Sequence, residues 1–179
     1  MSILNKFLKS RRAAATTLIS LTIVLLLTYA AFLIVEVGRL YALHNRFQND
    51  LDFANGAAWA AIDRERLAYG VVQFHAVNES RSEGDRRAED VFLAALRKGM
   101  NVSDLMTPES PAQSVIAGPV ELNDFQVYLA SDLPAATPQG FPIEKISVYS
   151  KITIPVKLLF FGQVFQMGVQ RVTDFQKTN

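Results

Sequence analysis

Residues 13–35 form a run of 23 residues without a charged side chain, and this run directly follows a basic cluster. The cluster consists of Lys6, Lys9, Arg11 and Arg12. An α-helix rises about 1.5 Å per residue, so the run is roughly 34 Å long and can cross a hydrocarbon layer of about 30 Å. We therefore predict a transmembrane helix over residues 13–35, preceded by a basic flank over residues 1–12.

The distribution of charge predicts the orientation of this helix. Residues 1–36 contain four basic residues and one acidic residue, whereas residues 37–179 contain 14 basic and 16 acidic residues. Basic residues stay on the cytoplasmic side, so we expect a single-pass cell-membrane protein with residues 36–179 exported. The basic cluster is then a topogenic signal and not a nucleic-acid patch. A cleaved secretory signal is the alternative, but its apolar region normally spans about 7–15 residues, which favours an uncleaved anchor.

Helical patterning continues beyond the apolar run, to about residue 75. Apolar positions recur at steps of three and four, which is one stripe of an amphipathic helix. With the tryptophan that follows it, the stripe forms a candidate interaction face made of Leu40, Leu43, Phe47, Leu51, Ala54, Ala58 and Trp59. Two interpretations stay open. The stripe packs on the chain's own sheet, or part of it packs against neighbouring subunits.

The remaining chain predicts a short helix and three strands. Residues 78–87 are polar and read as a loop, the helix is expected over 87–98, and Gly99 suits its C-terminal cap. Strands are expected over residues 122–130, 144–157 and 163–175, with a loop over 135–142. The last two strands are joined by a short glycine-containing link, which predicts an antiparallel hairpin. The fold class is therefore α+β, with a long N-terminal helix and a small antiparallel sheet.

Side-chain alternation predicts which faces of the hairpin are buried. Ile146, Val148, Ile152, Ile154 and Val156 share one face of the first strand. Phe165, Met167, Val169 and Phe175 are expected on the inner face of the second strand. Pro155 predicts an edge position or a strand end, because proline donates no ladder hydrogen bond.

No residue pattern predicts catalysis, a cofactor or a metal site. The chain has no cysteine, which excludes disulfides and thiolate chemistry, and its two histidines, His44 and His75, are far apart in sequence. Close acidic pairs such as Asp50 and Asp52 have spacings that point helical side chains in different directions. We expect no enzyme and no small-molecule substrate. Glu36 and Arg39 form a candidate ion pair that marks the outer membrane boundary, or else a subunit contact there.

Several N-terminal segments together resemble the TadE/TadG-like family of tight-adherence (Flp-type) pilus assembly proteins. They are the basic pair Arg11-Arg12, the apolar span, the junction Val35-Glu36-Val37-Gly38-Arg39-Leu40-Tyr41, the step Arg46-Phe47-Gln48-Asn49, and the alanine-rich residues 54–61. The C-terminal hairpin is similar to the tail of shorter members. The resemblance implies a bacterial membrane protein of pilin-like architecture, with pilin or pilus-assembly subunits as partners. Residues 12–17 lack the glycine and glutamate of prepilin-peptidase substrates, which implies an uncleaved component.

Two functional hypotheses follow. The first is a membrane-anchored structural component of pilus assembly, whose exported domain contacts other subunits. The second is a membrane-tethered binding or sensing module unrelated to pili, which would need a ligand pocket lined by convergent polar groups. An exported enzyme is a distant third.

Overall fold

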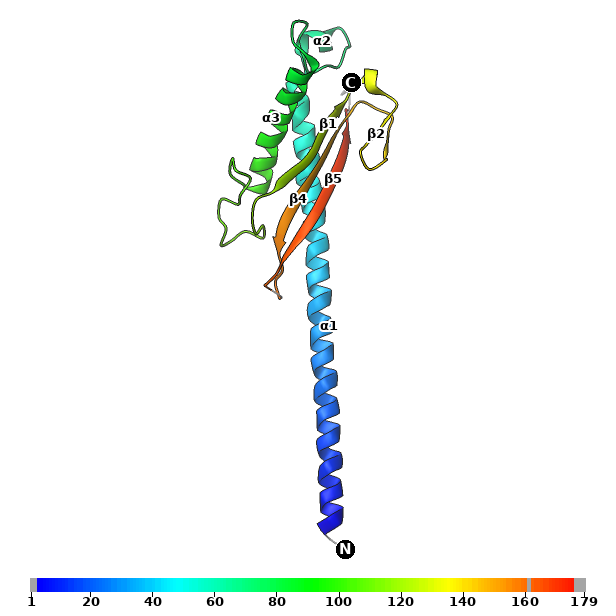
Figure 1. Ribbon diagram of the computed structural model, residues 1–179, viewed down its shortest axis with the longest axis vertical. Helices are drawn as coiled ribbons and strands as arrows, with labels where there is room; N and C mark the ends of the chain where they lie inside the picture. Colours follow the sequence, from blue (N-terminus) through cyan, green and yellow to red (C-terminus); the bar gives the residue numbers. More distant parts are fainter. Residues whose placement is uncertain (1–2, 161, 176–179) are drawn as a thin grey trace. The chain divides into compact units, whose positions relative to one another are not determined.

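The computed structural model describes residues 3–160 and 162–175, with side chains from Ala14 onward. Its helices are α1 (Ile3–Ala58), α2 (Arg64–Ala68) and α3 (Arg81–Met100), with 3-10 turns η1 (Trp59–Ala61) and η2 (Ala130–Asp132). Its strands are β1 (Glu121–Tyr128), β2 (Ala135–Ala136), β3 (Pro142–Ile143), β4 (Ser147–Lys157) and β5 (Val164–Asp174) (Figure 1). The α+β class, with one long N-terminal helix and a small antiparallel sheet, is confirmed.

The chain divides into two units. Residues 1–42 are the N-terminal unit and contain the first part of α1, and residues 43–179 are the folded domain. In the N-terminal unit, every side chain from Ala14 to Val35 is exposed. The helix that includes them is long and apolar enough to cross a membrane. The basic residues Lys6, Lys9, Arg11 and Arg12 precede the described side chains.

The first helix is shorter than predicted. It ends at Ala58 and not near residue 75, and the chain then forms η1 and, after Asp63, the new helix α2. The Asp63 side chain accepts a hydrogen bond from the Arg66 backbone N–H at 2.9 Å, which caps α2. Trp59 packs on the rings of Phe74 and Phe175, with centroids 5.5 and 5.0 Å away. These contacts bring distant segments to the end of α1, and helix periodicity alone contains no sign of them.

The second long helix begins earlier than predicted. Residues 81–87 belong to α3 and not to a loop, because Ser80 and Glu83 form a capping box at its start. The Ser80 backbone N–H donates to the Glu83 carboxylate at 2.8 Å. At the other end, Gly99 lies inside the helix, and Asn101 takes the left-handed cap position with φ of 56°. The short helix predicted over 87–98 therefore lies inside the longer helix α3.

The main sheet has the strand order β1-β4-β5, and all pairs are antiparallel. The predicted hairpin is confirmed, with a continuous register from Ser147 opposite Asp174 to Lys157 opposite Val164. Pro155 lies in the central strand and not at an edge. It is tolerated there because β1 pairs with β4 only as far as Thr153, so Pro155 lies beyond the end of β1.

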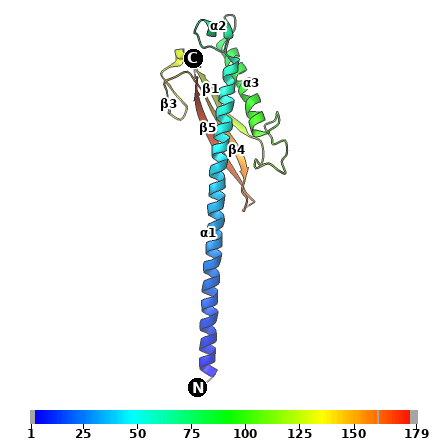
Figure 2. The same ribbon diagram turned by 180° about the vertical axis from the view of Figure 1, so that it is seen from behind.

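Each face of this sheet carries buried side chains within the folded domain. The inner face of β4 contributes Val148, Ile152, Ile154 and Val156 to the core, all fully buried. Helix α1 lies across this face (Figure 2), and Phe92 of α3 packs on Phe125 of β1 with ring centroids 4.9 Å apart. On the outer face, Tyr128, Ile143 and Tyr149 form a second cluster. The segment predicted as a loop over 135–142 includes the short β2–β3 ladder that supplies Ile143.

Candidate functional site

The predicted interaction face of α1 is mostly the core of the folded domain. Leu51, Ala54 and Ala58 have no exposed surface, and Phe47 is 2% exposed. These four residues are buried within the folded domain and are not available to a partner. Leu40, Leu43 and Trp59 are half-buried. A charge introduced at Leu51 or Ala58 would therefore disrupt the domain itself and would not report on a subunit contact.

Asn55, which the sequence did not single out, fixes α1 to the hairpin. Its side chain is completely buried, and its Oδ1 accepts a hydrogen bond from the Ser150 hydroxyl at 2.7 Å. Its Nδ2 donates to the Thr173 hydroxyl at 3.2 Å and approaches the carbonyl oxygens of Val148 and Arg171 at 3.5 and 3.4 Å. A buried amide with these partners specifies one register of helix on sheet. The sequence does contain a sign of this role, because Asn55 is a polar residue in the apolar stripe, one helical turn after Leu51.

The neighbouring acid Asp52 extends this network to the surface. The Thr173 hydroxyl donates to the Asp52 carboxylate at 2.6 Å, and Arg171 Nε lies 3.4 Å from the same oxygen. Asp50 lies on another side of the helix, with its carboxylate 3.9 Å from Arg46. The sequence-adjacent acids Asp50 and Asp52 therefore have separate partners. Within residues 3–160 and 162–175, no three acidic or histidine side chains come close enough to hold a metal ion.

The end of the apolar run has the predicted ion pair. In the N-terminal unit, the Arg39 guanidinium donates to Glu36 Oε1 at 2.7 Å. Glu36 is 3% exposed. Pairing with Arg39 therefore offsets part of the cost of removing its carboxylate from water.

The polar side chains inside the apolar run are satisfied locally. The Thr22 hydroxyl donates to the Leu18 carbonyl at 2.9 Å, and the Thr28 hydroxyl donates to the Val24 carbonyl at 2.8 Å. Each bond returns to the preceding helical turn, so neither hydroxyl needs water. An apolar helix with such threonines suits a hydrocarbon environment.

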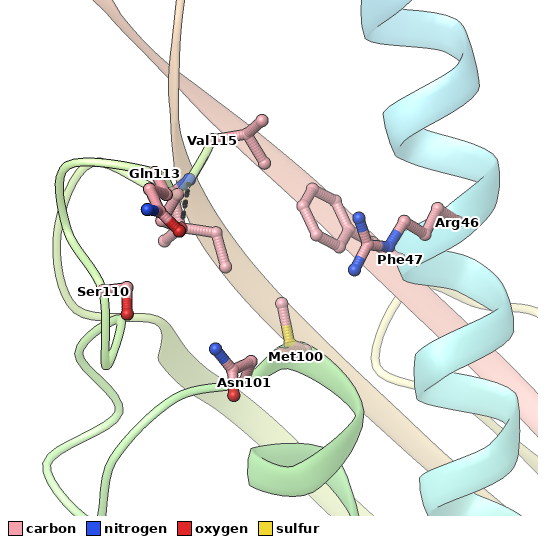
Figure 3. A pocket seen from close by; sticks show the side chains of 9 residues that line it. Arg46, Phe47, Met100, Asn101, Ser110, Gln113 and Val115 are labelled. Carbon is pink, nitrogen blue, oxygen red and sulfur yellow. Dashed lines mark hydrogen bonds between the residues drawn. The ribbon is translucent and has the colours of Figure 1, made fainter.

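An open cavity of about 280 Å³ lies in the folded domain between α1 and the loop after α3 (Figure 3). Arg46 and Phe47 line it from α1, and Met100, Asn101 and Gln113 line it from the other side. This volume is just below the usual range for small-molecule sites, about 300–1,000 Å³. Arg46, the cation of the cavity, already has Asp50 as a neighbour. The cavity is the candidate site for the alternative hypothesis of a ligand-binding module.

Ion pairs at the start of α3 connect it to the sheet end. The Arg81 guanidinium donates to Asp132 of η2 at 2.6 Å and lies 3.5 Å from Asp85. The hydrogen bond from Arg81 lowers the pKa of Asp132 below its ordinary value. Burial raises the pKa of Asp85, and Arg81 offsets part of that rise. This cluster holds α3 against the end of β1 and is a structural contact.

No family model, no curated protein and no solved structure matches this chain. The resemblance in the N-terminal region remains an expectation.

Two groups of exposed apolar side chains remain on the folded domain. One lies in the segment between α1 and α3, where Tyr69 and Val77 are 88% and 77% exposed. The other, here called the hairpin-turn patch, consists of Leu159, Phe160, Val164 and Phe165 at the β4–β5 turn. Phe165 lies on the predicted inner face, opposite the buried Val156, but its side chain is 46% exposed.

Proposed function

We propose that this protein is a membrane-anchored structural component of a tight-adherence-type pilus assembly system. The observation that carries the proposal is the helix α1, whose apolar and exposed segment 14–35 continues into the core of an α+β domain. An apolar helix surface of this length is stable in lipid and not in water. The pilus part of the proposal is supported by the junction from Val35 to Tyr41 and by the pilin-like order of elements.

The physical role in this proposal is that of a fixed anchor. One helix supplies both the apolar segment and the inner core residues Leu51, Ala54 and Ala58, so no loop separates the two functions. The Asn55 network then fixes that helix to the hairpin. The basic flank keeps the N-terminus in the cytoplasm, and the domain is held outside, where it contacts pilin or assembly subunits. Those contacts use surfaces other than the buried stripe.

The test compares two chains in the native host after deletion of the gene. The first chain is full-length, and the second carries a cleavable export signal in place of residues 1–35. Pili are quantified in the sheared fraction, and the protein is located by carbonate extraction of membranes. We expect the deletion to lose pili, the full-length chain to restore them from the membrane fraction, and the released domain to fail.

Each contrary result addresses a different part of the proposal. Normal piliation of the deletion strain would contradict the pilus role and favour the membrane-tethered binding module. Restoration by the released domain would show that the anchor is dispensable. Extraction of the full-length chain by carbonate would contradict membrane insertion.

A further inference from the structure

The β4–β5 turn has an unusually apolar surface for a turn on an exported domain. In the hairpin-turn patch, Leu159 is 60%, Val164 52%, Phe165 46% and Phe160 43% exposed. The sequence has no charged residue from Leu158 to Gln170. Turns at a water-exposed surface normally consist of polar residues and glycine. Large exposed apolar side chains gathered at one turn, on both faces of the hairpin, are typical of an interaction site.

The patch lies at the end of the β4–β5 ladder. The ladder continues to the pair Lys157 and Val164, and the Leu158 N–H then donates to the Gln163 carbonyl at 2.9 Å. Backbone pairing therefore holds Val164 and Phe165 at the end of the ladder, and Leu159 and Phe160 directly follow its last pair. A fixed projection of large apolar side chains is suited to insertion into a soft apolar environment.

The contacts of α1 show which end of the folded domain has this turn. Asn55 lies beside Val148 and Thr173, which pair with each other near the open end of the hairpin. Phe47, two turns earlier in α1, lines the same cavity as Ile116, and Ile116 bridges Val156 near the closed end. Following α1 backwards through the domain therefore leads toward the turn. The turn projects from the end at which α1 enters the domain.

The short connection to the apolar run limits the distance from this end to a membrane. Residues 36–42 lie between the run and the folded domain, and they are helical. Seven helical residues rise only about 10 Å. The headgroup region on each side of a bilayer is about 5–8 Å thick, so this connection is little longer than the headgroup region that it would have to cross.

We infer that the hairpin-turn patch inserts into the outer headgroup and acyl boundary of the membrane that α1 crosses. The inference depends on the proposed anchoring of the chain. Leucine, valine and phenylalanine gain free energy by leaving water at this depth, and the uncharged turn removes no ion from water. The patch gives the domain a second, peripheral contact with lipid, which limits rotation and tilting about the helix.

The test uses the absence of cysteine from the chain. Val164→Cys introduces a thiol within the patch. Val77→Cys introduces a thiol at an exposed position in the segment that follows the other end of α1. Each full-length variant is labelled with an environment-sensitive NBD dye and reconstituted into vesicles of phosphatidylethanolamine and phosphatidylglycerol. A second set of vesicles contains lipids with a nitroxide quencher near the headgroup. Flotation on a density gradient measures anchoring separately.

We expect blue-shifted NBD emission and a loss of intensity with the nitroxide lipids at position 164, and water-like, unquenched emission at position 77. Water-like emission at both positions in floated protein would overturn the inference and leave the anchor proposal intact. A blue shift at position 164 without lipid quenching would also overturn it, because a second protein would then cover the patch. Quenching at both positions would contradict insertion through this patch in particular. Failure of the protein to float would overturn both the inference and the anchor proposal.

Discussion

Two glycines inside α3 provide a direct test of the packing between that helix and the segment before it. A Cβ at Gly84 would lie 2.7 Å from the Phe74 carbonyl carbon and 2.8 Å from the His75 backbone nitrogen. A Cβ at Gly99 would meet only side-chain atoms of Asp50, at 3.8 Å. Both glycines lie in the same helix, so helix propensity favours alanine at each. We expect Gly84→Ala to destabilise the domain and Gly99→Ala to stabilise it.

The magnitudes follow from two opposing effects. Alanine exceeds glycine in helix stability by up to about 1 kcal/mol, and this gain applies to both variants. Overpacking against backbone atoms costs about 1–3 kcal/mol, and it applies only to Gly84, whose neighbours cannot rotate away. The difference in the free energy of unfolding between the two variants is therefore about 1–3 kcal/mol. The net effect of Gly84→Ala is a loss of up to about 2 kcal/mol, and that of Gly99→Ala is a gain of up to about 1 kcal/mol.

The assay is urea unfolding of the full-length chain in detergent micelles, followed by tryptophan fluorescence. Trp59 is the single tryptophan of the chain, and it stacks on Phe74, whose backbone the new methyl group would displace. Gly99→Ala is the matched control for the effect of alanine on the helix itself. A Gly84→Ala protein as stable as the Gly99→Ala protein would refute the close approach of the segment over the first turn of α3.

Two further outcomes are expected from the buried polar groups of α1. Asn55→Ala leaves the Ser150 hydroxyl without its partner, so we expect the free energy of unfolding to fall by about 2–3 kcal/mol. A double-mutant cycle with Ser150→Ala should show coupling, and additive losses would contradict the hydrogen bond. Burial raises the pKa of Asp50 above its ordinary value of 3.8, and Arg46 offsets part of the rise. The native state therefore binds the proton more tightly than the unfolded chain, and stability falls as the pH rises through about 3.8. At pH 7, Asp50→Asn should unfold at a higher urea concentration than the wild type, and the difference should shrink toward pH 4. Equal urea midpoints at pH 7 would count against this reasoning.

Local patterns in the sequence were sufficient for the elements that depend on local physics. The alternation through β4 and the glycine-containing link predicted the hairpin, because period-two burial and turn chemistry are properties of adjacent residues. The pair Glu36 and Arg39 was predicted from its i,i+3 spacing. The capping box at Ser80 and Glu83 was equally local, and reading it would have placed the start of α3 correctly.

Local patterns did not show which surfaces of the chain are available to a partner. Amphipathic periodicity shows that one side of α1 is apolar, but it does not distinguish the chain's own sheet from a neighbouring subunit. The described contacts decide this for Phe47, Leu51, Ala54 and Ala58, which pack within the domain. Phe165 lies on the predicted inner face, but alternation alone does not show that its side chain is 46% exposed.

The sequence by itself determined the apolar run, its basic flank, the α+β class and the hairpin, because each follows from composition or from the spacing of near neighbours. Only the tertiary structure decided that α1 stops at Ala58, that Asn55 fixes it to β4 and β5, and that Gly84 must lack a side chain. These features depend on segments tens of residues apart, such as Trp59 with Phe175. No local pattern records which distant surfaces will meet, because their meeting depends on the packing of the whole domain.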